Sequence, residues 1–400
     1  MRTVAVVGAS LAGLSAARSL RKRGYDGRLV VIGDERHRPY DRPPLSKEFL
    51  SGALGEADLA LERDDEDLQA EWVLATRATG LDRTERAIRL ADGREIRADG
   101  VVIATGAAPR TLPGTEDLVG VHVLRTLDDA RALRDDLARG GRLVVIGGGF
   151  IGAEVASTAY ALGLDVTVVE AAPTPLAGPL GESMGAIVSA LHADHGVRLL
   201  CGVGVKGLSE DGRSEMGAPS DRARGRVDAV LLEDGRSTPA DIVVVGVGVR
   251  PCVEWLEGSG VALDNGVKCG ADGRTSLAGV VAVGDCANWY DPHTGSRRRV
   301  EHWTGALERP DTAVAALLAH GATPPGVPRP PYFWSDQYGV KIQFVGHAVG
   351  ADSVTVEEGS TDERSFLAVY RRAGTPVAVL GMNQPRLFTR WRKQLTAAKS

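Results

Sequence analysis

The stretch LVVIGGGFIGAEVA, residues 143–156, decides the fold. Its apolar start predicts a short buried strand, and the glycine-rich turn that follows leads into a helix. Gly147, Gly149 and Gly152 form an intact G-x-G-x-x-G pattern. Glycines at these positions allow a tight turn, a close approach to a pyrophosphate and close packing of helix on strand. The stretch therefore predicts a dinucleotide site at a helix N-terminus, where free N–H groups and the helix dipole attract phosphate.

The end of the next strand indicates which dinucleotide binds. The strand DVTVVE ends in Glu170, 18 residues after Gly152. A carboxylate at this place accepts a hydrogen bond from the 2′-hydroxyl of NAD and repels the 2′-phosphate of NADP. Two alanines follow Glu170, and no arginine occurs before Arg198. We therefore expect NADH rather than NADPH, and weak binding of NADH stays an open hypothesis.

A second unit of the same kind opens the chain. TVAVVGASLAGLSAA, residues 3–17, is again an apolar strand, a glycine turn and a helix start. Gly8 allows the turn and Gly13 close helix packing, but Ser10 replaces the middle glycine. The serine either crowds a phosphate or points away from it. The next strand ends in Asp34 and Glu35, which could bind a ribose hydroxyl. Alone, this motif could also be an ordinary strand–turn–helix.

Two such units in one chain indicate two nucleotides. The economical interpretation is one FAD that stays bound and one NAD(P)H that visits, with a hydride passing between them. The predicted fold class is α/β with two Rossmann-like dinucleotide-binding domains. A length of 400 residues leaves room for a third domain.

Composition restricts the other functions. A net charge of −5 gives no reason to expect a nucleic-acid partner. The apolar run near the start is too short to cross a bilayer, so we expect no membrane partner and a cytoplasmic location. The four cysteines are far apart and form no C-x-x-C pair, so no metal site or redox dithiol is predicted; they are Cys201, Cys252, Cys269 and Cys286.

Three further segments fit a flavin domain. VVIATGAAPR, residues 101–110, is a strand that ends in a glycine turn, which is also typical of an ordinary strand exit. GVVAVGDCAN, residues 279–288, predicts a strand followed by a helix, where Asp285 could bind ribityl hydroxyls or cap the helix. RPYDRPPLSKEFL, residues 38–50, carries Arg42 and Lys47 on a proline-stiffened loop that could equally be a rigid surface loop.

These segments together resemble a known family. The motifs GASLAG, PYDRPPLSK, ATGAAPR, GGGFIGAE, VGVGVRP, AVGDCAN, VEHW and YFWSDQYG occur in family order, from Val4 to about Gly346. In them the chain resembles the NADH-dependent ferredoxin reductases that serve Rieske-type dioxygenases and bacterial cytochromes P450. The resemblance implies an enzyme whose FAD takes a hydride from NADH. It also implies that electrons leave one at a time to a small acidic [2Fe–2S] ferredoxin, which feeds the oxygenase.

The resemblance also implies roles for particular side chains. Lys47 and Glu154 would lie beside the flavin ring, with Glu154 also facing the nicotinamide. We expect Glu154 in the first turn of its helix, where the dipole favours a carboxylate, and simple stabilisation of the helix start is the alternative. Pro44 and Trp303 would line the ring, and Trp334 would approach it from the third domain. Each tryptophan could instead be ordinary core packing.

The candidate residues follow from the motifs and the resemblance. The expected catalytic residues are Lys47 and Glu154. The expected FAD-binding residues are Gly8, Ser10, Leu11, Ala12, Gly13, Asp34, Glu35, Arg42, Pro44, Lys47, Ala104, Thr105, Gly106, Arg125, Gly284, Asp285, Glu301, His302, Trp303 and Trp334. The expected NAD-binding residues are Gly147, Gly149, Phe150, Ile151, Gly152, Glu154, Glu170, Gly246, Val247 and Gly248.

We expect three domains of the glutathione-reductase type. The FAD domain is discontinuous, residues 1–108 and 237–314, and the NAD domain occupies residues 109–236. Residues 315–400 form an α+β domain with an antiparallel sheet, because VKIQFVGHA, SVTVEEG, RSFLAVYRR and TPVAVLGMN alternate like strands. It would cover the flavin and help to dock the partner. Residues 323–331 predict a proline-rich linker and residues 209–226 a polar inserted loop.

The electrons must leave by an external acceptor. Relatives that reduce disulfides need a cysteine pair, and relatives that reduce peroxide or oxygen need a reactive cysteine where this chain has Ser46 and Lys47. Two basic runs could dock a ferredoxin or could be solvated surface, namely Arg297–Arg299 and the group Arg386, Arg390, Arg392 and Lys393. The rival interpretations are an NADH oxidase, a rubredoxin or nitrite-linked reductase, and a redox-gated interaction protein resembling apoptosis-inducing factor.

Overall fold

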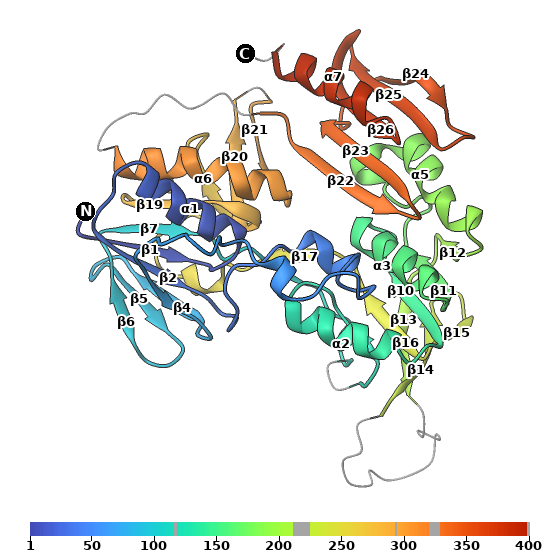
Figure 1. Cartoon of the computed structure of the whole chain (residues 1–400), viewed down its shortest axis with the longest axis horizontal. Helices are drawn as coiled ribbons and strands as arrows, with labels where there is room; N and C mark the ends of the chain where they lie inside the picture. Colours follow the sequence, from blue (N-terminus) through green and yellow to red (C-terminus); the bar gives the residue numbers. More distant parts are fainter. Residues whose placement is uncertain (116–117, 211–224, 293, 320–328, 398–400) are drawn as a thin grey trace.

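The computed structural model describes residues 1–115, 118–210, 225–292, 294–319 and 329–397. Two parallel sheets and one antiparallel sheet form the centres of three lobes (Figure 1). Most of the expected inserted loop and most of the expected linker lie outside the described residues. Among the described residues, no helix has the length and apolarity needed to cross a bilayer.

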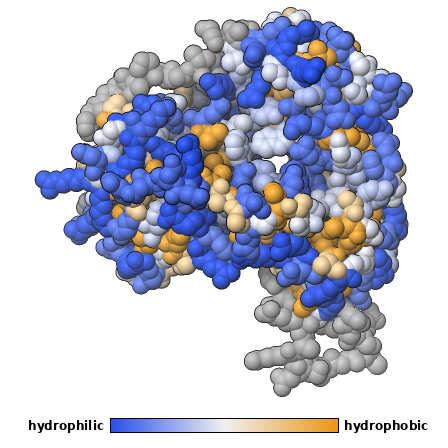
Figure 2. All heavy atoms as spheres, viewed as in Figure 1, coloured by the Kyte–Doolittle hydropathy of each residue, from blue (hydrophilic) through white to orange (hydrophobic). Residues whose placement is uncertain are grey.

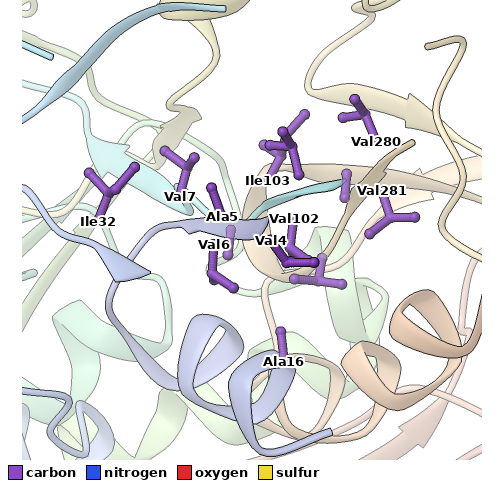
Figure 3. Close-up of a cluster of buried hydrophobic side chains, with 14 of the residues drawn as sticks. Val4, Ala5, Val6, Val7, Ala16, Ile32, Val102, Ile103, Val280 and Val281 are labelled. Atoms are coloured by element: carbon purple, nitrogen blue, oxygen red, sulfur yellow. The ribbon is translucent and has the colours of Figure 1, made fainter. Parts of the chain in front are cut away.

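The first lobe is built on a five-stranded parallel sheet. Its central strand carries Val4, Ala5, Val6 and Val7, all at most 2% exposed, which is typical of a parallel sheet covered on both faces. Figure 3 shows these side chains with Ala16, which points from helix α1 toward the sheet. The strands, in spatial order, are β19 (Val280–Ala282), β7 (Gly100–Ile103), β1 (Thr3–Val7), β2 (Arg28–Ile32) and β3 (Ala70–Val73), and the helices beside them are α1 (Leu11–Lys22) and α6 (Trp303–Leu318).

The second lobe repeats this arrangement around the second glycine motif. The sheet order is β12 (Arg198–Cys201), β11 (Asp165–Glu170), β10 (Arg142–Ile146), β16 (Ile242–Val245) and β9 (Val121–His122), with all pairs parallel. Its helices are α2 (Leu127–Leu137), α3 (Phe150–Ala161), α4 (Ala177–Leu180) and α5 (Glu182–Asp194). Because β16 pairs with β10, the second lobe extends to about Val245, and the boundary expected at residue 237 is too early.

Smaller elements complete these two lobes. The first lobe carries two three-stranded sheets, β4 (Ala78–Asp82), β5 (Ala87–Leu90) and β6 (Glu95–Arg97), and β18 (Val267–Cys269), β20 (Ala287–Asp291) and β21 (Ser296–Arg299). The second lobe carries β13 (Val205–Glu210), β14 (Val227–Leu232) and β15 (Ser237–Pro239). The chain crosses between the lobes at β8 (Ala107–Pro109) and returns at β17 (Val249–Pro251), and these two strands pair with each other.

One expected helix is absent. After Gly284 the chain forms a single 3-10 turn, η4 (Gly284–Cys286), and then continues as strand β20. The strand pairs with β18 on one side and β21 on the other. These pairings outweigh the glycine-turn pattern, which in the two dinucleotide motifs does precede a helix. Asp285 therefore does not cap a helix here.

The third lobe is an antiparallel sheet with one helix. All four expected strands are present, and the segment YFWSDQ adds a fifth at the edge of the sheet. The sheet order is β22 (Tyr332–Gln337), β23 (Val340–Gly346), β26 (Thr375–Met382), β25 (Ser365–Arg372) and β24 (Ser353–Ser360), followed by α7 (Pro385–Ala397). Leu180 and Leu191 share a core with Phe344, Phe366 and other residues of this sheet. The third lobe is thus packed on the second lobe, as Figure 1 shows for α5.

The loop with the proline motif also reaches the second lobe. Leu45, Phe49 and Leu50 are at most 2% exposed and pack with Leu127 and Leu133 of α2. The loop contains two 3-10 turns, η1 (Pro43–Ser46) and η2 (Ala57–Leu59), and a third turn, η3 (Glu254–Leu256), follows β17. The loop is therefore no surface feature. It lies where the first and second lobes meet.

The interface of the second and third lobes contains a histidine that should make the fold acid-sensitive. His192 is 1% exposed and shares a hydrogen bond of 2.7 Å with the hydroxyl of Tyr338. Burial, together with nearby His195, lowers the pKa of His192 to about 4. The unfolded chain therefore binds the proton more readily than the folded one, and stability falls as pH drops from about 6.5 to 4. The full effect is about 3 kcal/mol.

Denaturant titrations between pH 4 and 7.5 measure this effect. The variant H192Q should show a flatter dependence of unfolding free energy on pH than the wild type. Equal slopes for the two proteins would show that folding does not lower the pKa of His192.

Candidate active site

The first glycine motif leaves no space for side chains at its outer two glycines. Gly8 has φ +124°, and a Cβ atom there would lie 2.0 Å from the carbonyl oxygen of Ala104. A Cβ atom on Gly13 would lie 1.8 Å from the carbonyl oxygen of Gly8, so the glycine allows α1 to pack against the turn. Ser10, at the middle position, makes no cap to α1. Its hydroxyl instead accepts a hydrogen bond of 3.2 Å from Nε of Arg42.

A large cavity opens beside this motif, where the three lobes meet. Its volume is about 1030 Å³, at the upper end of the roughly 300–1000 Å³ usual for small-molecule sites. The molecule is visibly hollowed there in Figure 2. All of the candidate FAD-binding residues except Gly13 and Pro44 line the cavity. Gly13 lies under the helix, and Pro43 lines the wall in place of Pro44. A dinucleotide-sized ligand fits this space.

Arg42 is held rigidly in the cavity wall. Its Nη2 donates to Oε1 of Glu35 at 2.6 Å, and its Nη1 donates to the carbonyl oxygen of Arg125. The hydroxyl of Tyr40 donates to the other oxygen of Glu35 at 2.5 Å, and burial raises the pKa of Tyr40 well above its usual range. A guanidinium has five N–H donors, so donors of Arg42 remain for an anion such as a pyrophosphate.

Two other candidate acids are paired with arginines. Asp285 accepts a hydrogen bond of 2.7 Å from Nη2 of Arg125, across the cavity wall. Asp34 pairs with Arg77 at 2.7 Å, but both side chains are more than half exposed. The first pair is partly buried and joins η4 to the loop after β9. The second is a surface pair at the cavity mouth, where a ribose could compete for the carboxylate.

Lys47 and Glu154 form a buried ion pair in the wall of the same cavity. Nζ of Lys47 lies 2.6 Å from Oε2 of Glu154, and the two side chains are 12% and 7% exposed. Nζ also donates to the carbonyl oxygen of Pro43 at 2.9 Å. Because the two charges share a nearly dry site, removing either one would leave the other buried without its counter-charge. Glu154 lies in the second turn of α3, which begins at Phe150, so the expected placement in the first turn is wrong.

Two serines complete the surroundings of this carboxylate. Ser46 donates to Oε2 of Glu154 at 2.5 Å, and Ser335 donates to Oε1 at 2.7 Å. Gln337 in turn donates to the hydroxyl of Ser335 at 3.0 Å. Glu154 therefore accepts from Lys47 and Ser46 on one oxygen and from the third lobe on the other. All three lobes contribute to one carboxylate.

Aromatic side chains from the three lobes form another part of the wall. The indole Nε1 of Trp303 donates to Oδ1 of Asp41 at 2.7 Å. Trp303 also contacts Trp334 edge to face, with ring centroids 5.8 Å apart. Phe333 stacks at a tilt on Phe150, at 4.6 Å. Trp303, Trp334, Phe150 and Phe333 all line the cavity, so neither tryptophan serves only as core packing.

The second glycine motif is a separate cradle. Gly147 has φ +103°, and a Cβ atom on Gly152 would lie 2.2 Å from the carbonyl oxygen of Gly147. Gly149 is the N-cap of α3 and has open space around its Cβ position. Glu170 accepts hydrogen bonds from the backbone N–H groups of Gly148 at 2.7 Å and Ala172 at 2.8 Å. The open N-terminus of α3 beside this carboxylate fits the adenosine diphosphate half of NAD.

The candidate NAD-binding residues divide between these two places. Phe150, Ile151 and Glu154 line the large cavity, whereas Gly147, Gly149, Gly152, Glu170, Gly246, Val247 and Gly248 do not. Helix α3 connects the two groups, because it begins at the second cradle and its next turn reaches the cavity. One helix can thus bind a phosphate at its start and present Glu154 about one turn later.

The cysteines offer no thiolate. All four are unpaired. Burial raises the pKa of Cys269 to about 12 and that of Cys286 to about 11. Burial also raises the pKa of Cys252, the one cysteine in the cavity wall. A thiol that stays protonated at neutral pH is a poor nucleophile. Among the described residues, no group of three or more His, Cys, Asp or Glu side chains could hold a metal ion.

Comparisons with known proteins place the chain in a family. Residues 2–309 match the pyridine nucleotide-disulphide oxidoreductase family, and residues 332–400 match the reductase C-terminal domain. The ferredoxin–NAD(+) reductase subunit of the benzene 1,2-dioxygenase system of Pseudomonas putida is 37% identical over 96% of this chain and 90% of its own length. The chain belongs to the ferredoxin–NAD(+) reductases.

Solved structures of ferredoxin reductases have the same three lobes. The reductase in a covalent putidaredoxin reductase–putidaredoxin complex superposes with a TM-score of 0.91 and 33% identity, over 99% of this chain and 93% of that one. The ferredoxin reductase of the CYP199A2 system from Rhodopseudomonas palustris gives a TM-score of 0.91 and 36% identity, over 100% and 96% of the two chains. These values confirm the predicted α/β fold with its antiparallel C-terminal domain.

Several residues of the site are not among the candidates expected from the sequence. Tyr40 and Asp41 lie in the same loop as Arg42. Trp303, the partner of Asp41, is 262 residues away in the sequence, whereas Glu35, the partner of Tyr40, is five residues away. Ser335 and Gln337 follow Trp334 in the motif FWSDQ at strand spacing, and both are at most 1% exposed. Two buried polar residues on one strand face are a signal for a polar partner, but the sequence does not say which.

Proposed function

We propose that this protein is an FAD-dependent NADH:ferredoxin oxidoreductase of an oxygenase system. FAD accepts a hydride from NADH and releases the two electrons singly to a [2Fe–2S] ferredoxin. The observation that carries the proposal is the Lys47–Glu154 pair in the wall of a dinucleotide-sized cavity, with Glu154 on the helix that starts at the second cradle. A cytochrome P450 or a Rieske oxygenase would be the final acceptor.

The roles of the residues follow from their positions. The first cradle and Arg42 would hold the FAD pyrophosphate, and Asp285 or Arg125 the ribityl chain. The second cradle would bind NADH, with Glu170 favouring NADH over NADPH by charge. Glu154 would hold the ammonium group of Lys47 beside the flavin and orient the nicotinamide. The aromatic wall would exclude water from the site. We assign residues 1–108 and about 246–318 to FAD, 109–245 to NAD, and 329–397 to the C-terminal domain.

The cysteine chemistry argues against the rival enzymes. An oxidase or peroxidase that works through a sulfenic acid needs a reactive thiol at the flavin, and Ser46 occupies the corresponding place next to Lys47. Cys252 reaches the cavity with a raised pKa, so it does not supply a thiolate. We infer a cytoplasmic location, because four unpaired thiols fit a reducing compartment.

An anaerobic titration tests the function. NADH should bleach the visible bands of the bound flavin, and NADPH should do so much more slowly. Cytochrome c should then be reduced only when a [2Fe–2S] ferredoxin is added. Bleaching without transfer to ferredoxin would favour an oxidase or a redox-gated interaction protein, and a protein that binds no flavin would contradict the proposal.

The ferredoxin is expected to dock on helix α7 rather than on the other basic run. Arg386, Arg390 and Lys393 are exposed, and no ion pair engages them within the described part of the chain. By contrast, Arg299 is paired with Glu301, and its side chain is 10% exposed. Free cations on an exposed helix can steer an acidic partner, with rate effects of about 10-fold or more.

The double variant R386E/R390E should therefore reduce ferredoxin about 10-fold more slowly at low ionic strength and with a weaker salt dependence. Reduction of ferricyanide by NADH should be unchanged. The matched control R83E/R86E alters the charge equally, on exposed residues of the turn between β4 and β5, which lies far from α7 (Figure 1). If both double variants slow ferredoxin equally, net charge rather than α7 attracts the partner.

A further inference from the structure

One face of strand β22 has nearly the same side-chain spacing as one face of helix α3. Phe333, Ser335 and Gln337 alternate along β22 and so share one face. Phe150 and Glu154 lie four residues apart on one face of α3. Four helical residues rise about 6 Å, and two strand residues advance about 6.7 Å. The spacings of the two faces therefore agree, and β22 packs beside α3 (Figure 1).

The third lobe contacts successive turns of α3. Phe333 contacts Phe150 at the first turn of α3, with ring centroids 4.6 Å apart. Ser335 donates to Glu154 at the second turn, at 2.7 Å. The backbone N–H of Tyr338 donates to the hydroxyl of Ser157 at the third position, at 2.7 Å. The third lobe thus holds the helix that carries Glu154 at three consecutive points.

The hydroxyl of Ser335 has a defined direction. A serine hydroxyl has one donor hydrogen and two acceptor lone pairs. Gln337 donates into this hydroxyl at 3.0 Å, so its hydrogen is left for Glu154. Ser335 is 0% and Gln337 1% exposed, so water does not compete for either side chain. A hydrogen bond to a carboxylate stabilises its charged form and fixes its rotamer.

We propose that Ser335 is a positioning residue for Glu154: its hydroxyl, directed by Gln337, holds the carboxylate turned so that the other oxygen meets Lys47. The proposal rests on the proposed function, because it assigns Glu154 to the reduction of FAD by NADH. Ser335 does not line the cavity and acts only through Glu154. The C-terminal domain thereby completes the site as well as covering it.

Few other charges act on this carboxylate. Lys47 faces it from the end of η1, at 2.6 Å. On β22, Asp336 alternates to the opposite face and pairs with Lys341. His302 is separated from α3 by the ring of Phe333, and burial lowers its pKa to about 4. Lys47 is therefore the charged group that a change in Glu154 affects most directly.

Three variants test the proposal in the flavin-loaded protein. S335A removes the donor, and Q337M keeps the volume but removes the group that directs the hydroxyl. S189A is the matched control, because it deletes another buried hydroxyl, which bonds only within α5. The measurements are the rate of flavin reduction at saturating NADH between pH 5 and 9, the NADH dissociation constant, and the flavin midpoint potential from dithionite titration.

We expect S335A to be reduced about 10-fold more slowly at pH 7, the usual effect of losing a hydrogen bond to a charged group. The acidic limb of its pH–rate profile should move upward by about one pH unit. The NADH dissociation constant should stay within about twofold, Q337M should change in the same direction, and S189A should match the wild type.

A wild-type rate and pH profile in S335A would overturn the proposal. An equal loss of the reduction rate in S189A would also overturn it, because that result would indicate a general destabilisation of the protein. If S335A does not fold, the same criteria apply to Q337M. If NADH fails to reduce the wild type, the proposed function is wrong. The flavin midpoint potential then tests the positioning role by itself. A midpoint potential that is unchanged in both S335A and Q337M would refute that role.

Discussion

The variant E154Q is expected to lose about 3 to 5 kcal/mol of unfolding free energy and most of its reduction by NADH. Glutamine keeps the shape of the side chain but removes the charge that Lys47 meets at 2.6 Å. The ammonium group then remains in a nearly dry wall with the carbonyl oxygen of Pro43 as its main partner. A buried charge without its counter-charge is among the most destabilising changes in a protein.

A double-mutant cycle separates stability from function. The variant K47M/E154Q removes both charges, so it should recover much of the lost stability. It should not recover the rate of flavin reduction, because neither charged group is present to position the reactants. Thermal or denaturant unfolding and stopped-flow reduction by NADH measure the two quantities.

A surface pair gives the control. Arg28 and Glu71 form an ion pair at 2.8 Å whose side chains are about half exposed, so E71Q should cost less than about 1 kcal/mol. If E154Q costs no more than E71Q, the Lys47–Glu154 pair is well solvated in the protein. If K47M/E154Q is reduced at the wild-type rate, the pair has no part in the reaction.

The sequence predicts most of the fold because its strongest signals are local. The two glycine motifs each occupy one strand, one turn and one helix, so their geometry depends on residues within about 15 positions. Gly8 and Gly147 are at tight turns, as their patterns predict. The point at which the chain returns to the first lobe is not set by local residues. It follows β16, and β16 is placed by pairing with β10, about a hundred residues earlier. No local pattern marks that strand as part of the second sheet.

The residues of the site also fall into two groups, those within a local motif and those brought together from distant parts of the chain. The motif glycines and the lining residues next to them were predictable, since the pattern itself requires them there. Ser335 meets Glu154 across 181 residues and Trp303 meets Asp41 across 262. Such contacts depend on how complete lobes pack against each other. The prediction of a helix after Gly284 was wrong for a similar reason, because the pairing of β20 with two strands overrides the local turn signal.

The variant G152A is expected to lose about 3 kcal/mol or more of stability and its binding of NADH. Its new Cβ atom would lie 2.2 Å from the carbonyl oxygen of Gly147 and 3.2 Å from Cγ1 of Val145. The first contact is with backbone in a turn that is itself fixed by close approach to Gly246. Since neither backbone segment can yield, helix α3 must move away from the sheet and take Glu154 with it.

The neighbouring variant G149A tests whether this cost comes from packing. Gly149 has φ −72° and no atom within 4 Å of its Cβ position, so alanine there costs only the weaker N-cap and should lower the unfolding temperature far less than G152A does. Ser10 already shows that the equivalent position of the first cradle accepts a side chain, which turns toward Arg42. Calorimetry and NADH titration should therefore find G149A folded with weakened NADH affinity, and G152A destabilised. Equal unfolding temperatures would show that α3 does not need its close approach to the sheet.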